Sequence, residues 1–104
     1  MTSYRIVFVS ASGMEEARRI ARAAVERKLA ACVNIVPKIV SIYRWEGEVV
    51  EDEEVLMIFK TLGHNLDALE RLVKELHSYE VAEFIAIEID EGSEEYLRWI
   101  DEVL

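Results

Sequence analysis

Cys32 supplies the one thiol of the chain, and His64 and His77 supply its two imidazoles. A thiolate with imidazole or carboxylate neighbours suits copper, whereas carboxylates alone suit harder cations. No CxxC or HxxxH spacing places these residues side by side, so the local sequence does not define a metal site. Two interpretations of Cys32 therefore stay open together: a copper ligand, and a small side chain packed within a strand.

Three other segments have both a structural and a chemical interpretation. His77 follows the last residue of a predicted helix, where it acts either as a cap favoured by the helix dipole or as a ligand for a metal ion or an anion. The acidic run 51–54 either holds a hard cation weakly or protects the edge of a hairpin. Residues 10–13 lead into a helix N-terminus, which favours capping by Ser12 and also suits an anion.

Aromatic residues offer a possible pocket, while the known catalytic patterns are missing from the sequence. The four candidates for pocket lining, which are equally suited to a core or an interface, are Tyr43, Trp45, Tyr79 and Trp99. The sequence contains no Ser-His-Asp set, no nucleophilic cysteine with its base and no P-loop, so we expect no enzymatic activity. Its 12 basic and 21 acidic residues give a net charge of −9, which disfavours nucleic acid as a partner.

Strand and helix patterns in the first half of the chain position these residues. Tyr4 to Ser10 is apolar on both faces and predicts a central strand. Ser12 with Glu15 reads as a capping box for a helix over 14–28. From Ala31 to Trp45 apolar residues occupy both parities, which predicts a strand that is broken, bulged or at a sheet edge near its proline, Pro37.

The second half of the chain continues this alternation. Glu46-Gly47 predicts a tight turn into a strand over Val49–Thr61, interrupted by the acidic run 51–54. A helix is expected from about Asn65 to His77, and alternation over Phe84–Asp90 predicts a last strand before a helix capped by Ser93. The order predicts an α+β fold of the ferredoxin-like βαββαβ type with a C-terminal helix, as a single domain over residues 1–104.

The long hairpin between the second and third strands predicts an oligomer. A fifteen-residue strand at about 3.3 Å per residue reaches roughly 50 Å, whereas a 100-residue domain has a radius of gyration of about 13 Å. The hairpin must therefore bend or project. Its apolar residues on both parities would remain in water unless another subunit covers them.

Composition adds expectations about location and stability. The 104 residues are 52% hydrophobic, enough for one core, and the single cysteine fits a reducing compartment, so we expect a cytoplasmic protein. No apolar run is long enough to cross a bilayer, so no membrane association is expected. The absence of glutamine and the 32% charged content are typical of thermostable proteins.

Four segments, taken in order and spacing, resemble the CutA divalent-cation tolerance family over nearly the whole chain. They are Leu-Ala-Ala-Cys-Val-Asn at 29–34, Tyr-Arg-Trp-Glu-Gly at 43–47, Lys60-Thr61, and Glu-Leu-His-Ser-Tyr at 75–79. The resemblance implies a tight homotrimer similar in architecture to PII signalling proteins, associated with copper binding and metal tolerance and with no established reaction.

The resemblance also implies roles for five residues. Cys32 and His77 match the family's cysteine and histidine and are the expected metal ligands, with a copper ion as the expected cofactor. Glu54, Lys60 and Tyr79 match an acid, a lysine and a tyrosine of the family and are the expected ligand-binding residues.

The sequence departs from the family pattern at three positions. Ser78 and Ala82 stand where the family usually has prolines, so the loop leading to Glu83 lacks their rigidity. Val9 stands where some members have a further cysteine, so a multi-thiolate copper site is not implied here.

Other functions of proteins with this fold are alternatives to the metal-tolerance interpretation. The main alternative is a PII-like signalling or scaffold trimer that binds a small ligand in the cleft between subunits and reports it to a protein partner. Acylphosphatase-like catalysis is disfavoured because residues 10–13 contain no arginine to hold phosphate, and RNA recognition is disfavoured because of the −9 charge.

Overall fold

The computed structural model describes residues 3–104, so the first two residues of the predicted 1–104 domain lie outside it. Its elements are β1 (Tyr4–Ala11), α1 (Met14–Glu26), β2 (Cys32–Trp45), β3 (Glu48–Leu62), the short 3-10 helix η1 (Gly63–Asn65), α2 (Leu66–Leu76), β4 (Ile85–Glu88) and α3 (Glu94–Val103). The strands form one antiparallel sheet in the order β2-β3-β1-β4, which confirms the ferredoxin-like α+β prediction. No helix within residues 3–104 meets the length and apolarity that a membrane span requires.

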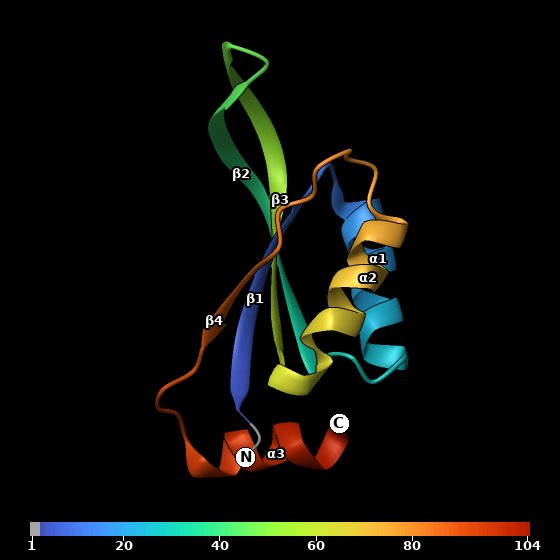
Figure 1. The fold of residues 1–104 in the computed structure, drawn as a ribbon, viewed down its shortest axis with the longest axis vertical. Coiled ribbons are helices and arrows are strands. Elements are labelled where there is room, and N and C mark those ends of the chain that lie inside the picture. The colour runs from blue at the N-terminus through green and yellow to red at the C-terminus, as the bar shows by residue number, and fades with distance from the viewer. Residues whose placement is uncertain (1–2) are drawn as a thin grey trace.

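Helices α1 and α2 lie together against one face of the sheet (Figure 1). Alternate residues of β1 and β3 point to this face, because successive side chains of a strand point to opposite faces. The fully buried strand side chains include Val7, Val9, Met57 and Phe59, and those of the helices include Ile20, Leu69 and Val73. The core therefore lies between this face and the two helices.

Helix α1 differs from its prediction at both ends. The expected capping box of Ser12 with Glu15 is wrong, because Gly13 is the N-cap residue and Glu16 is the acid that accepts hydrogen bonds from Ser12. Glu16 lies one residue further along, where its side chain is buried and also accepts a hydrogen bond from the Ser78 backbone N–H. The helix ends at Glu26 rather than at 28, because Lys28 adopts the left-handed conformation with φ of 58°.

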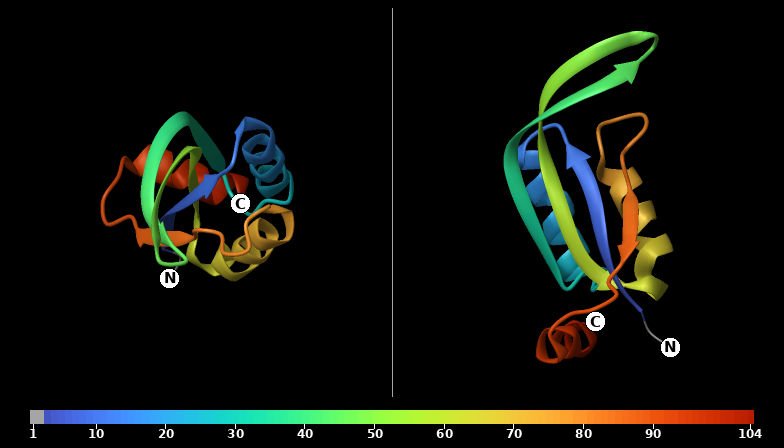
Figure 2. Two further views of the ribbon diagram at one scale, coloured as in Figure 1. Left: turned by 90° about the horizontal axis from the view of Figure 1, so that it is seen from above. Right: turned by 90° about the vertical axis from the view of Figure 1, so that its left-hand side faces the viewer.

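The β2–β3 hairpin projects well beyond the helices (Figures 1 and 2). It makes the molecule 44 Å long but only 25 and 22 Å wide. The register shifts between Val36 and Ile39, which confirms the predicted bulge near Pro37, and β2 is an edge strand. The predicted interruption of the next strand is wrong, because β3 pairs with β2 on through the acidic run 51–54. Glu51, Asp52 and Glu53 are exposed on this two-stranded ribbon, whereas Glu54 is buried.

The hairpin turn is the one predicted. Glu46 and Gly47 have φ of 49° and 80°, the left-handed values that a two-residue hairpin loop needs at both positions. Glycine adopts this conformation without the steric cost that a side chain carries.

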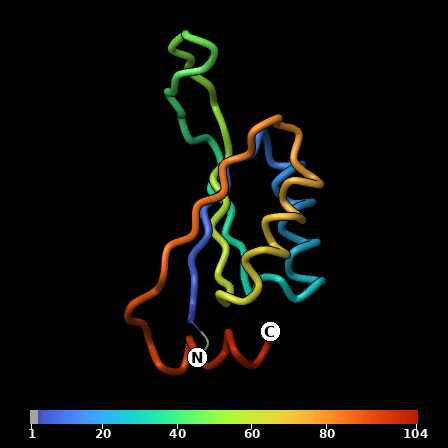
Figure 3. The backbone as a smooth tube through the Cα atoms, in the orientation of Figure 1, coloured from blue at the N-terminus to red at the C-terminus, as the bar shows by residue number. Residues whose placement is uncertain are grey.

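After α2 the chain turns back along the sheet into β4, which pairs with β1 on the side away from β3 (Figure 3). Strand β4 is shorter than the predicted Phe84–Asp90, because only Ile85–Glu88 pair with β1. Helix α3 begins as predicted, with the Ser93 side chain accepting a hydrogen bond from the Tyr96 backbone N–H. It passes below the lower end of the sheet (Figure 2).

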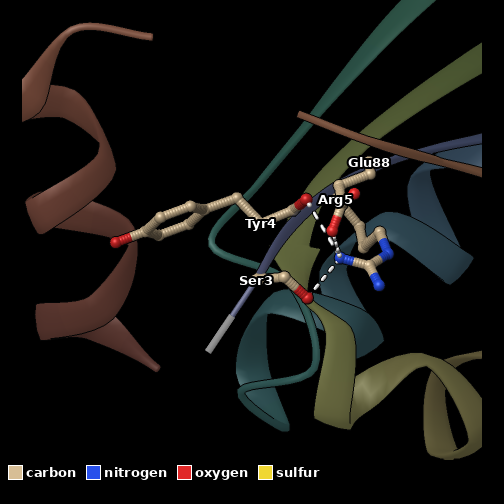
Figure 4. Close-up of polar contacts among 4 residues, drawn as sticks. All are labelled: Ser3, Tyr4, Arg5 and Glu88. Carbon is tan, nitrogen blue, oxygen red and sulfur yellow. Dashed lines mark hydrogen bonds and ion pairs between the residues drawn. The ribbon is translucent and has the colours of Figure 1, made fainter. Parts of the chain in front are cut away.

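Polar contacts tie the start of β1 to its neighbours. The Arg5 guanidinium contacts the Ser3 hydroxyl and lies 3.5 Å from the Glu88 carboxylate of β4 (Figure 4). The adjacent Tyr4 ring points the other way, toward α3, where its hydroxyl donates to Asp101. These contacts connect β1 to β4 and to the terminal helix.

Candidate functional site

The loop after α2 is held to the end of β1 through His77. Its Nε2–H donates to the Ser10 backbone oxygen at 2.7 Å, and its Nδ1 accepts from the Tyr79 backbone N–H at 3.0 Å. Since one ring nitrogen donates and the other accepts, the imidazole is the neutral Nε2–H tautomer. Both nitrogens are occupied within the chain, so His77 coordinates a metal ion only if one of these contacts is broken.

Glu16 fastens the same loop to α1. Its Oε1 accepts from the Ser78 backbone N–H at 2.8 Å, and its Oε2 accepts from the Ser12 N–H and hydroxyl at 3.2 and 3.3 Å. Burial acts to raise the pKa of this carboxyl, but its hydrogen bonds with Ser78 and Ser12 outweigh burial, so the pKa of Glu16 is lowered. The loop therefore has a charged anchor beneath it.

Tyr79 reaches from this loop to the hairpin. Its hydroxyl donates to Glu54 Oε2 at 2.7 Å, and its ring centroid lies 4.7 Å from that of His77. Partial burial and the Glu54 carboxylate raise the pKa of Tyr79 well above its usual value, so the phenol remains a hydrogen-bond donor at neutral pH.

A hollow of about 670 Å³ opens beside this contact, and we call it the hairpin hollow. Its lining comes from the end of β1, the projecting part of the hairpin and the loop after α2. The lining residues are Ser10, Ser41, Ile42, Tyr43, Trp45, Glu54, Tyr79, Glu80, Val81 and Glu83. Three are glutamates, three are aromatic and none is basic, so the hollow is acidic with aromatic walls.

Glu83 also lines the hollow, although the sequence marks it only as the end of a loop. Partial burial, together with the charge of Glu54, raises the pKa of the Glu83 carboxyl. The two carboxylates therefore repel each other across the hollow. No local sequence motif marks Glu83 as a site residue, because only the fold brings it close to Glu54.

Cys32 and Lys60 lie at the other end of the sheet, where they are paired across β2 and β3. The half-buried Cys32 thiol makes a long contact of 3.9 Å with Asn34 Oδ1, and the Lys60 ammonium donates to the same oxygen. Burial, and secondly the neighbouring thiol, raise the pKa of Tyr96 on α3, which lies beside Cys32. A thiol, an ammonium and a phenol are thus gathered below the sheet.

The five predicted site residues therefore fall into two groups. Glu54 and Tyr79 line the hairpin hollow and His77 packs against Tyr79, while Cys32 and Lys60 meet near α3. Ser10, which His77 contacts, pairs with Leu56 of β3, and Lys60 lies four residues further along that strand. At about 3.3 Å per residue, the two positions are roughly 13 Å apart. A single chain does not bring Cys32 and His77 to one ion, and residues 3–104 contain no group of three or more His, Cys, Asp or Glu side chains placed to hold a metal.

The aromatic candidates separate in the same way. Tyr43, Trp45 and Tyr79 line the hairpin hollow, as the pocket interpretation expected. Trp99 lies on α3 instead, with its ring centroid 5.5 Å from that of Tyr96.

The sheet face opposite α1 and α2 is apolar. Neighbouring strands place Ile6 beside Ile87 and Phe8 beside both Ile58 and Ile85 on this face. Ile85 and Ile87 are 52% and 50% exposed, although isoleucine is among the residues most often buried. With the exposed Val40, Ile42 and Val49 of the hairpin, this makes a large unpartnered apolar surface.

Comparisons with known proteins agree with this architecture. A model of the family described as CutA1 divalent ion tolerance protein matches residues 5–103. The chain is 53% identical over 97 residues to the divalent-cation tolerance protein CutA of Thermus thermophilus, across 93% of this chain and 94% of that protein. The solved structure of CutA1 from Oryza sativa has a TM-score of 0.94 at 44% identity and covers 97% of this chain and 93% of its own.

Some relatives are much longer. The chain is 46% identical over 101 residues to Protein CutA of Mus musculus. This match covers 97% of this chain but only 57% of the mouse protein. The similarity extends over almost all of the described fold, whereas the rest of the mouse protein has no counterpart in it.

Proposed function

The chain belongs to the CutA1 divalent ion tolerance family, and from that premise we propose that it is a non-enzymatic, copper-binding protein of the tolerance type that works as a homotrimer. The observation that carries the copper proposal is the Cys32 thiol. It is half-buried rather than sealed in the core, and its contact with Asn34 is long and weak. A thiolate is the group in this chain with the strongest preference for copper over hard cations.

One thiol is not a complete copper site, so the proposal requires more than one chain. Lys60 and Tyr96 lie beside Cys32, but lysine and tyrosine are not the soft or imidazole ligands that copper prefers. His77 lies at the other end of the sheet in the same chain. In our proposal a neighbouring protomer supplies the further ligands, and His77 contributes only across a subunit boundary.

The homotrimer proposal is supported by the unpartnered apolar sheet face and by the exposed edges of β2 and β4. Edge strands with free backbone groups and large exposed apolar patches are features that subunit contacts cover. We further propose a cytoplasmic location, because a reducing compartment keeps a lone thiol free to bind a soft metal.

Copper titration by calorimetry tests the proposal. We expect Cys32→Ser to weaken copper binding by about tenfold or more, while weak calcium and magnesium binding by surface acids stays unchanged. His77→Ala reports whether the imidazole shares the ion, and His64→Ala, which removes the other imidazole of the chain, is the matched control. If Cys32→Ser binds copper as tightly as the parent, the copper proposal fails and Cys32 is a packing residue.

A further inference from the structure

The hairpin hollow has a chemistry that a copper site does not explain. Its lining combines three glutamates with Tyr43, Trp45 and Tyr79 and includes no lysine, arginine or histidine. Its volume of about 670 Å³ falls within the roughly 300 to 1,000 Å³ of small-molecule sites, far more than a bare ion needs. The lining therefore favours a ligand that carries both a positive charge and an apolar surface.

Glu54 gives the hollow a prepared anionic group. The residue is only 6% exposed, and its Oε2 is fixed by the Tyr79 hydroxyl. Its carboxylate belongs to the lining of the hollow, where burial has removed much of its water. A cationic donor in the hollow would compensate for that lost hydration.

Glu83 adds a second carboxylate that repels the first. Its raised pKa arises from partial burial and then from the charge of Glu54. A positive charge between the two carboxylates relieves this repulsion. The hollow is therefore stabilised by a bound cation more than an ordinary solvated acidic surface would be.

The shape of the hollow favours an organic cation over a metal ion. Within the described residues, no three acidic, histidine or cysteine side chains are arranged for metal coordination. Tyr43 and Trp45 instead offer aromatic faces, which attract ammonium groups and pack against methylene chains. Both are exposed on the hairpin, at 40% and 43%, so their rings are accessible in this chain.

We propose that the hairpin hollow binds an aliphatic diamine or polyamine, with an ammonium group between Glu54 and Glu83 and the methylene chain against Tyr43 and Trp45. This ligand class goes beyond the copper proposal and does not depend on it, because the hollow is at the opposite end of the sheet from Cys32.

Calorimetric titration of the full chain, in its native assembly, with spermidine tests the proposal. Two probes accompany it: 1,4-butanediol, which has a methylene chain without charge, and Mg²⁺ at the same ionic strength, which has charge without a chain. We expect saturable binding of spermidine, no heat from butanediol, and little displacement of spermidine by Mg²⁺.

Three variants locate the binding. Glu83→Gln keeps the shape of the side chain and removes one charge, and Trp45→Ala removes one aromatic wall at an exposed position. We expect each to weaken spermidine binding by roughly tenfold. Glu75→Gln removes the same charge from the exposed face of α2, outside the hollow, and we expect it to change the affinity less than about twofold.

Four results would overturn the proposal. They are no saturable spermidine binding, equal binding of butanediol, full displacement by Mg²⁺ at matched ionic strength, and an equal loss in Glu75→Gln and Glu83→Gln. Trp45→Ala alters an exposed side chain of the hairpin, so it keeps the test decisive if circular dichroism shows that Glu83→Gln fails to fold.

Discussion

Glu16 is the buried charge that connects α1 to the loop carrying His77 and Tyr79. Its carboxylate accepts hydrogen bonds from two backbone N–H groups and one hydroxyl, and it is 7% exposed. Such bonds are made best by the ionised form, which is why they lower the pKa of this group despite its burial. The deprotonated Glu16 side chain therefore helps to hold the loop in position, together with the contacts of His77 and Tyr79.

We predict that Glu16→Gln lowers the free energy of unfolding by about 1 to 3 kcal/mol at pH 7, because the amide nitrogen leaves a buried N–H without an acceptor. Since the folded pKa is lowered, the stabilisation by Glu16 is complete above its unfolded value of 4.5 and is lost as pH falls through the folded pKa. Denaturant unfolding between pH 7 and pH 3 should show a flatter acid dependence in the variant.

Glu15→Gln is the control for that measurement, since it removes the same charge from the same turn at an exposed position. We expect it to change stability by less than about 0.5 kcal/mol. An equal loss in both variants would mean that net charge, rather than the hydrogen bonds of Glu16, is responsible.

At the scale of elements, α1 ends in a Schellman motif. The Leu29 N–H donates to the Ala24 carbonyl at 2.9 Å, and the Lys28 N–H donates to the Val25 carbonyl at 3.1 Å. This pattern requires a left-handed residue, and Lys28 fills that position with φ of 58°. Glycine is the usual residue there because it has no Cβ to resist the conformation.

We predict that Lys28→Gly raises the free energy of unfolding by about 0.5 to 1 kcal/mol, because it relieves the left-handed strain at the end of α1. Lys28→Ala is the matched control, since it removes the same charge but keeps a Cβ. Urea unfolding should separate the two variants, and equal stability would show that charge rather than backbone conformation decides the effect.

At the scale of the whole molecule, which is 44 Å long, the projecting hairpin and the apolar sheet face are the features that a lone chain leaves uncovered. Burial of apolar surface at about 25 cal/mol per Å² makes such a face a strong driving force for association. The proposed homotrimer would bury it. The thermal stability expected from the composition stays a prediction and depends on this assembly as well as on the core.

We predict that the native protein sediments at three times the 12.0 kDa chain mass and that Ile87→Lys shifts it toward the single-chain mass at micromolar concentration. Ile87 lies on the apolar sheet face, where a buried charge is unfavourable. Val25→Lys makes the same change at a 43% exposed position of α1 and should leave the assembly intact. Sedimentation at 12.0 kDa for the native chain would contradict the trimer.

Local sequence patterns were enough to predict the secondary structure and turns, which depend on neighbouring residues. Period-two and helical patterns predicted every strand and the three main helices, Pro37 predicted the bulge and Glu46-Gly47 the turn, because these signals act within a few residues of the backbone. The local patterns failed at residue detail, as in the choice of Glu15 over Glu16, because Glu16 also bonds to Ser78, which is far away in the sequence.

Which candidate residues lie close together depends on the tertiary structure. Glu54 and Lys60 are six residues apart on β3, yet one faces the hairpin hollow and the other lies beside Cys32, because an extended strand carries them about 20 Å apart. Glu83 and Glu54 are far apart in sequence, yet both line the hollow, because His77 holds the loop after α2 to the end of β1. Strand register and loop path depend on long-range packing, which the spacing of residues in the sequence does not contain.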